Sequence, residues 1–265
     1  MAARIYTTDG PALKLISFAN GSNGSITAQL YLPKDYHGDR KYPSIVIGDS
    51  MASVKEQMSG TYASQLALNG IIAMAIDYTN WGESSGIERQ VENPLQKAAD
   101  LSSAIWRQYP LYGCRRYSDG VEIRQQSGRQ ARELFHRTGE IEIIRAYSDT
   151  EAAASKNPSD SYYMDHSRGG GIREWRNSFS VMGWESWLAF DPVSKAPHVK
   201  TPTLMIHSER AAFPKQASKV YDLLAGPKES IWMDATHYDF YDDTQTVLQA
   251  VKHIAAFLHS TISVQ

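Results

Sequence analysis

One histidine occupies a position that suits acid–base chemistry. His237 lies in the run 234–239, directly after a predicted strand and before the last predicted helix. In open parallel sheets, the loops at the carboxyl ends of the strands carry the functional groups, and an imidazole exchanges a proton near neutral pH. Two interpretations of His237 stay open at this point, namely a catalytic base and a loop histidine that hydrogen-bonds its neighbours.

A carboxylate follows the preceding predicted strand. Glu209 ends the run 206–209 and is therefore expected at the same edge of the sheet as His237. A carboxylate in that place can hydrogen-bond the imidazole, fix its tautomer and stabilise the imidazolium. The alternative, which the residue taken alone favours, is a solvated glutamate paired with Arg210.

The turn after the first buried strand offers backbone amides. The run Gly48-Asp49-Ser50-Met51-Ala52 follows that strand, and the N–H groups of Ser50 and Met51 are candidates for an oxyanion hole if a nucleophile lies nearby. The run is close to the motif Gly-x-Ser-x-Gly, but Ala52 replaces the second glycine. The turn also follows the wrong strand for a nucleophile elbow. We therefore do not expect Ser50 to be the primary nucleophile.

The nucleophile itself is the least defined element. We recognise no nucleophile elbow at the end of a predicted strand. Cys114 follows the short apolar run 110–113, and the two arginines after it could lower the pKa of its thiol. Those arginines also stand where a tight strand-to-helix turn needs small residues, so an inert structural cysteine is the alternative. Ser118 lacks the first glycine of the motif, and Ser167 has no apolar strand before it.

Other classes of site are not predicted. The eight histidines are scattered, the single cysteine allows neither an intrachain disulfide nor a multi-cysteine zinc site, and no phosphate-binding glycine loop is present. We therefore expect no metal and no cofactor. With 27 Lys plus Arg against 29 Asp plus Glu, the formal charge of −2 argues against nucleic acid as a partner. No signal-type segment and no apolar run of about 20 residues is present, so we expect a cytoplasmic protein without a membrane segment.

Hydrophobic periodicity predicts an α/β fold for a single domain that spans residues 1–265. An antiparallel hairpin is expected first, and then strands and helices alternate, which implies a mostly parallel sheet with helices on both faces. A polar section at about 107–200 could be a cap over an active site or a poorly ordered insertion. The hairpin is expected at 13–18 and 26–32, further strands at 44–47, 71–76, 203–206 and 230–233, and helices at about 55–68, 94–105, 122–136, 214–224 and 247–258.

A set of local motifs carries a family resemblance. The runs Tyr42 to Gly48, Val54 to Gln57 and Gly82 to Gly86, and later Ala235 to Asp242, resemble the dienelactone-hydrolase-like branch of the α/β-hydrolase superfamily, as do parts of 162–191. Within that branch the sequence is similar to fungal polyketide transferases and hydrolases encoded beside polyketide synthases.

The resemblance implies a function and a set of roles. It implies an eight-stranded sheet and a nucleophile–acid–histidine triad, with His237 as the base, Glu209 as the acid and the turn from Gly48 to Met51 in the oxyanion hole. It also implies acyl transfer, or ester or thioester hydrolysis, on a small-molecule acyl or polyketide substrate in secondary-metabolite biosynthesis. A polyketide synthase is then a candidate partner.

Two departures from the family pattern shape the expectations. The family's Gly-His-Pro-Gly-Gly-type turn is replaced by the run 48–52, which adds the carboxylate of Asp49. In addition, the chain passes from the helix near Ile105 towards Gly120 where the family has a strand, the nucleophile elbow, a helix and another strand. The central nucleophile-bearing βαβ unit of about 30 residues is therefore missing or altered. Three hypotheses follow: an acyl-transfer enzyme or hydrolase with a displaced nucleophile, a non-hydrolytic acid–base cyclase or isomerase, and a catalytically inactive or truncated homologue.

Overall fold

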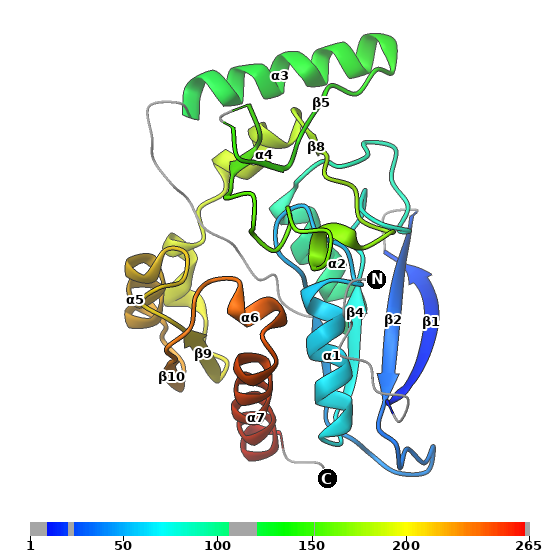
Figure 1. Cartoon of the computed structure of the whole chain (residues 1–265), viewed down its shortest axis with the longest axis vertical. Helices are drawn as coiled ribbons and strands as arrows, with labels where there is room; N and C mark the ends of the chain where they lie inside the picture. Colours follow the sequence, from blue (N-terminus) through cyan, green and yellow to red (C-terminus); the bar gives the residue numbers. More distant parts are fainter. Residues whose placement is uncertain (1–9, 21–23, 106–120, 151, 263–265) are drawn as a thin grey trace.

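The strands fall into two sheets. The computed structural model describes residues 10–20, 24–105, 121–150 and 152–262 (Figure 1). The larger sheet has the order β1-β2-β4-β3, in which β1 and β2 form the predicted antiparallel hairpin and β3 runs parallel to β4. Its strands are β1 (Ala12–Ala19), β2 (Ser25–Leu32), β3 (Ser44–Ile47) and β4 (Ile72–Ile76).

The smaller sheet comes from the C-terminal third of the chain. It contains β9 (Thr203–His207) and β10 (Lys228–Trp232), paired in parallel with Thr203 opposite Lys228. Within the described ranges no strand pairs with the outer edge of β3 or joins it to β9. The division falls at the position where the sequence predicts a missing or altered central βαβ unit. Residues 106–120, which include Cys114, lie outside the described part of the chain.

Helices cover both faces of the larger sheet, as the sequence predicts. Alternate residues of a strand point to opposite faces: Ile45 and Ile47 of β3 pack towards α1 (Met58–Leu68) and α7 (Thr244–Thr261), whereas Val46 packs with residues of α2 (Pro94–Ile105). In the smaller sheet, α5 (Pro214–Leu223) packs on β9, and the short helix α6 (Asp239–Asp242) leads into α7. None of the helices in the described ranges is long and apolar enough to cross a membrane.

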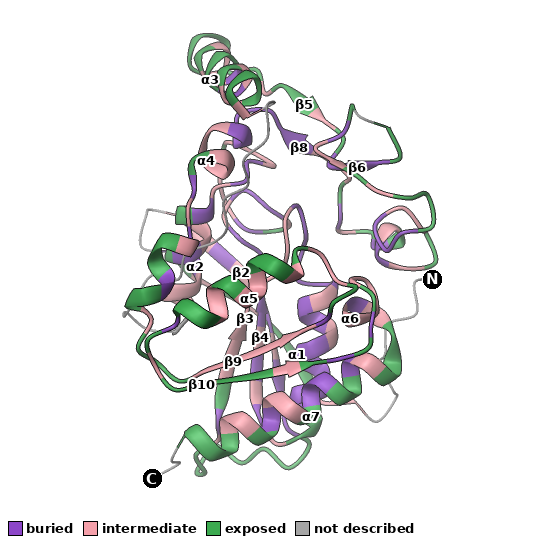
Figure 2. Ribbon diagram, turned by 90° about the vertical axis from the view of Figure 1, so that its left-hand side faces the viewer, coloured by how far each residue is buried: buried purple, intermediate pink, exposed green. Residues whose placement is uncertain are grey.

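Residues 121–150 and 152–202 lie across the carboxyl ends of β3 and β4 (Figures 1 and 2). Trp175 donates its indole N–H to the carbonyl of Ala52 at 2.7 Å, and Gln57 donates to the carbonyl of Gly169 at 3.0 Å. Arg132 ties the outermost helix to Glu185 and Glu88 at 2.9 and 3.0 Å. The elements of this section are α3 (Val121–Thr138), β5 (Ile143–Ile144), β6 (Tyr147–Ser148), β7 (Ser155–Lys156), the 3-10 turns Gly169–Gly171 and Val193–His198, β8 (Phe179–Ser180) and α4 (Gly183–Ala189).

The observed elements agree with the predicted ones with two differences. The helix expected from about residue 55 begins at Met58, because the residues before it form turns in which Gln57 accepts the N–H of Val54. The strand 44–47 was expected to be covered on both faces, but it is only partly buried. Within the described ranges, no strand pairs with its outer edge. The aromatic residues of the middle section pack in the core, among them Tyr162, Tyr163, Trp175, Phe179 and Trp184.

A buried ion cluster fixes the segment between β3 and α1. The ammonium group of Lys55 is fully buried and lies 2.7 Å from a carboxylate oxygen of each of Asp77, Glu56 and Glu83. The backbone N–H of Lys55 also donates to Asp77 at 2.9 Å. Burial acts to lower the pKa of the ammonium group, but the carboxylates, chiefly Asp77, raise it above its ordinary value. Lys55 therefore stays charged and holds this segment against the end of β4.

Replacing Lys55 tests this role. We expect Lys55→Met to lower the free energy of unfolding by about 3–5 kcal/mol, because it leaves buried carboxylates without a counter-ion. Urea denaturation at pH 7 measures the change. Lys252→Met, at an exposed position of α7, is the matched control and is expected to change stability by less than about 0.5 kcal/mol. Equal effects of the two substitutions would contradict the assignment.

Candidate active site

His237 lies in the loop after β10, as predicted, with both ring nitrogens in contact with the protein. The backbone N–H of Ala212 donates to Nδ1 at 3.4 Å, and the hydroxyl oxygen of Tyr241 lies 3.3 Å from Nε2. Because a donor faces Nδ1, the neutral ring carries its proton on Nε2, directed at Tyr241. A Ser-His-Asp-type triad needs the opposite tautomer, in which a carboxylate holds Nδ1–H.

The environment of His237 keeps its ring neutral. Burial lowers the pKa of His237 below its ordinary value of 6.5, and the nearby His207 lowers it further. At pH 7 the imidazole is therefore uncharged and able to accept a proton.

Glu209 and His237 come from neighbouring loops but do not make contact. Glu209 is exposed, and neither a hydrogen bond nor an ion pair joins it to His237. The alternative pairing with Arg210 is also not formed, because that guanidinium group lies 2.7 Å from Asp234. The role of Glu209 as the acid of a triad stays a prediction.

The turn after β3 directs its first amide towards a carboxylate. The N–H of Ser50 donates to Asp49 at 2.8 Å, and the same carboxylate accepts the hydroxyl and N–H of Ser59 at the start of α1, at 2.9 and 3.3 Å. The oxyanion role expected of Ser50 would require this internal bond to break. The carbonyl of Met51, the second oxyanion candidate, accepts the hydroxyl of Tyr147 at 2.7 Å.

Ala52 completes this turn in an unusual backbone conformation. Its φ is +54°, in the left-handed region that favours glycine, and it stands where the family motif has glycine. The N–H of Ala52 donates to Glu92 at 2.6 Å, and Glu92 is held in turn by Lys97 at 2.8 Å. These contacts stabilise a backbone conformation that alanine alone would avoid.

A cluster of hydroxyl groups at this turn lies beside the pair of Tyr241 and His237. Ser50 hydrogen-bonds Ser53 at 2.7 Å and the phenol of Tyr163, and Ser53 lies 2.6 Å from the same phenol. Tyr241, whose hydroxyl contacts His237, packs edge to face against Tyr163 with the ring centroids 6.0 Å apart. The hydroxyl cluster at the turn and the pair of Tyr241 and His237 therefore lie next to each other, in contact through the rings of Tyr163 and Tyr241.

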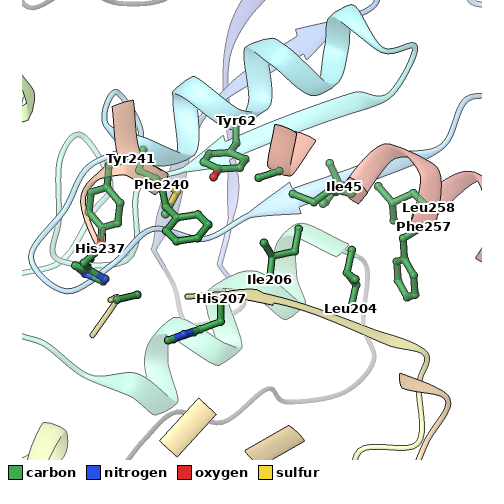
Figure 3. A pocket seen from close by; sticks show the side chains of 14 residues that line it. Ile45, Tyr62, Leu204, Ile206, His207, His237, Phe240, Tyr241, Phe257 and Leu258 are labelled. Carbon is green, nitrogen blue, oxygen red and sulfur yellow. Dashed lines mark hydrogen bonds between the residues drawn. The ribbon is translucent and has the colours of Figure 1, made fainter. Parts of the chain in front are cut away.

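A cavity of about 520 Å³ begins at His237 and extends between the two sheets (Figure 3). His237, His207 and Tyr241 lie together at one end, and Leu258 and Phe257 of α7 lie at the other. This size and apolar character are typical of a small-molecule site. The remaining lining residues are Ile45, Met58, Tyr62, Leu204, Ile206, Ala211, Phe240, Ala250 and Ile254.

The serine candidates outside the turn show no catalytic arrangement. The run 82–86 fits Gly-x-Ser-x-Gly, a match that sequence reasoning passed over, but Ser84 is buried in a loop, where its hydroxyl donates to the carbonyl of Asp77 and accepts the N–H of Thr27. Ser167 is exposed and hydrogen-bonds Asp165. Cys114 and Ser118 lie outside the described residues. In the described part of the chain, no three His, Cys, Asp or Glu side chains are grouped as metal ligands.

Comparison with known sequences gives partial matches. No protein-family model matches the chain. It is 40% identical over 92 residues to the uncharacterized protein YcjY of Escherichia coli (strain K12) and 43% identical over 90 residues to the uncharacterized protein PA2218 of Pseudomonas aeruginosa. Each match spans 34% of this chain, but only 30% of YcjY and 24% of PA2218.

Comparison with solved structures extends over nearly the whole chain. The crystal structure of PA2218 aligns with a TM-score of 0.75 at 23% identity, over 97% of this chain and 95% of that one. The α/β hydrolase GrgF from a Penicillium species aligns at 0.76 and 15% identity, over 94% and 99% of the two chains. DcsB in complex with its substrate analogue aligns at 0.77 and 16% identity, over 95% and 100%. The chain thus has the α/β-hydrolase fold, as the sequence predicts.

The carboxyl of Asp49 has a testable effect on stability. Loss of solvent contact raises its pKa from 3.8 to about 6, against the opposing hydrogen bonds from Ser50 and Ser59. The folded protein therefore binds this proton more tightly than the unfolded chain, and ionisation costs stability as the pH rises from about 4 to 6. For Asp49→Asn relative to the wild type, we expect a difference in the free energy of unfolding that rises by about 2 kcal/mol in favour of the variant across this range. Urea denaturation at pH 4.5 and 7.5 measures it, and a difference independent of pH would contradict the shift.

Proposed function

We propose that the protein is an α/β-hydrolase-like enzyme that carries out acid–base chemistry on the carbonyl group of an apolar, polyketide-like substrate. The observation that carries the proposal is the contact between His237 and Tyr241 at the polar end of the cavity. A neutral imidazole beside a phenol supplies both a proton acceptor and a hydrogen-bond donor to one reacting group. The alignment with DcsB bound to its substrate analogue and with the α/β hydrolase GrgF supports a small-molecule site on this fold.

The reaction that fits these groups is enolisation followed by isomerisation or ring closure. The C–H bond next to the carbonyl breaks, and its electron pair forms the C=C bond of the enolate. Its proton passes to Nδ1, the unprotonated nitrogen of His237, which gives up the long hydrogen bond of 3.4 Å from the N–H of Ala212. The hydroxyl of Tyr241 donates a hydrogen bond to the enolate oxygen, where the negative charge develops. The imidazolium then returns its proton to the product, which restores the enzyme. Water and a nucleophilic side chain take no part in this reaction.

Acyl transfer, or ester or thioester hydrolysis, is the second candidate. The fold itself favours it, and a nucleophile outside the described residues, with Cys114 as the sequence candidate, would complete it. This chemistry requires the ring of His237 to change tautomer and the N–H of Ser50 to leave Asp49, because each group is now in the state opposite to the one a triad uses. For both candidates the biological setting that we propose, from the family resemblance, is cytoplasmic secondary-metabolite biosynthesis with a polyketide synthase as the source of the substrate.

Substitution of the two contacting residues tests the proposal. With 2-decanone in D2O as the probe, we expect the enzyme to exchange the protons next to the carbonyl, as followed by proton NMR. His237→Ala is expected to lower the exchange rate by about 10²–10⁴-fold, as for loss of a general base, and Tyr241→Phe by about 10²-fold, as for loss of a donor to the oxyanion. Ser167→Ala, at an exposed serine away from the cavity, is the control. An unchanged rate in His237→Ala would remove the basis of the proposal.

The pH dependence of the same reaction gives an independent check. Because burial holds the pKa of His237 below its ordinary value of 6.5, the neutral form of the base becomes the major form at a lower pH than for a free imidazole. We expect the exchange rate to rise on the acid side with an apparent pKa below 6.5 and to reach a plateau near neutrality. A rate that keeps rising above pH 7.5 would contradict His237 as the base.

Covalent labelling separates the two candidate chemistries. Under the enolisation mechanism a fluorophosphonate probe is expected to label no serine above the background of the heat-unfolded protein, and Cys114→Ser is expected to retain activity. Mass spectrometry of the intact protein and of its peptides measures the labelling. Stoichiometric labelling of one serine, or loss of 4-nitrophenyl butyrate cleavage in Cys114→Ser, would favour acyl transfer.

A further inference from the structure

The cavity lies within the layer of the sheets, between two strand edges. Ile45 of β3 faces it from one side and Leu204 and Ile206 of β9 from the other (Figure 3). Ile254 of α7 also lines it. The walls are mostly apolar, and the groups with nitrogen, His207 and His237, gather at one end only. The space therefore suits a long apolar chain with its polar end at His237.

One polar group interrupts the apolar wall. Tyr62 of α1 is only 9% exposed and lines the cavity, and Figure 3 shows its hydroxyl directed into the space. This hydroxyl makes no hydrogen bond with any residue in the described ranges, although buried phenols usually have a partner. The phenols of Tyr241 and Tyr163, in contrast, have partners within the protein: His237 for Tyr241, and Ser50 and Ser53 for Tyr163.

We infer that the cavity binds an elongated aliphatic carbonyl compound that carries a second oxygen along its chain, and that the hydroxyl of Tyr62 donates a hydrogen bond to this oxygen. The inference rests on the proposed function for the position of the first carbonyl, at His237, and goes beyond it in the shape of the ligand and in the role of Tyr62. An unpartnered donor in an apolar site discriminates well, because a ligand without the matching acceptor leaves the donor unpaired. Tyr62 is then a specificity residue remote from the chemical step.

The walls account for the rest of the selectivity. Each methylene group that the ligand moves from water into the cavity improves its affinity about fourfold. The aliphatic chain of the ligand therefore provides most of the affinity. The hydrogen bond between Tyr62 and the second oxygen provides the selectivity between ligands of equal chain length.

The first test compares chains of equal length with and without the second oxygen. The probes are methyl decanoate and its 3-oxo and 5-oxo derivatives, and the measurement is displacement of 1-anilinonaphthalene-8-sulfonate followed by fluorescence. The parent protein is His237→Ala, which lacks the proposed base, and proton NMR checks that the probes stay unchanged during the binding measurement. We expect at least one oxo derivative to bind about 3- to 10-fold more tightly than methyl decanoate. Adding Tyr62→Phe, which preserves the ring, is expected to remove this preference while the affinity for methyl decanoate stays within about twofold.

The second test locates the binding site. Ile254→Trp places a bulky ring in the wall of the cavity and is expected to weaken binding of all three probes at least tenfold. Leu248→Trp, on the same helix but 44% exposed and outside the cavity lining, is the matched control and is expected to leave binding unchanged. Circular dichroism and thermal unfolding confirm that each variant is folded.

The outcomes separate this inference from the proposed function. Unchanged binding in Ile254→Trp, absence of binding by any probe, or a preference that survives Tyr62→Phe would overturn the inference. None of these results depends on turnover, so each leaves the catalytic role of His237 to be decided by the exchange rates. Conversely, selective binding that depends on Tyr62 would stand even if His237→Ala had no effect on catalysis.

Discussion

Within the described residues, the structure depends on side-chain packing between two sheets that no strand pairing joins. In the described residues, pairing ends at the outer edge of β3 and begins again at β9, so hydrogen bonds hold each sheet together but do not join the two. Side-chain packing joins them instead. Ile45 of β3 and Ile206 of β9 pack against the same buried cluster, to which α1 contributes Leu66 and α7 contributes Val251. Because hydrophobic packing is less directional than strand pairing, the two sheets are held together while space remains between their edges.

Side chains from the section that covers the carboxyl end of β3 fix the turn that follows this strand. In the turn from Gly48 to Ala52, at the carboxyl end of β3, Ala52 has a positive φ and Asp49 has a buried carboxylate. The neighbouring strands of the sheet do not account for this conformation. Tyr163, Tyr147 and Trp175 reach down to this turn and bond its hydroxyl and carbonyl groups. The turn is thereby fixed in a form in which Asp49, and not a substrate oxygen, accepts the N–H of Ser50. The section that covers the site therefore also determines the electrostatic environment of the turn from Gly48 to Ala52.

Local sequence patterns predicted the elements well and the contacts poorly. The strand 44–47 and the helix 122–136 stand out because a short apolar run and a helical period are properties of contiguous residues, and His237 was placed correctly because a loop after a strand is a local feature. Tyr241 was not predicted as a site residue, because its position one turn after His237 is typical of an ordinary helix residue. Tyr62 was not predicted either, because its position in a helix is typical of a core residue. The raised pKa of Asp49 and its bonds to Ser50 and Ser59 depend on segments that meet only in the fold. The run 82–86 shows the converse error, because its pattern matches a nucleophile motif whereas its backbone forms a loop around Asp77.

The choice between acid–base and acyl-transfer chemistry reduces to which nitrogen of His237 holds the proton. A triad carboxylate accepts a hydrogen bond from Nδ1–H and leaves Nε2 free to take a proton from a nucleophile. In this protein the amide of Ala212 occupies the place of that carboxylate and donates to Nδ1, so that the proton sits on Nε2 beside Tyr241. Glu209 is close in sequence to Ala212 but is exposed, and bringing it to the ring would displace the amide and bury a charge, at a cost that the ion pair would have to offset. A single loop after β9 therefore determines which of the two chemistries the imidazole can perform, and in the observed conformation it favours the pair with Tyr241.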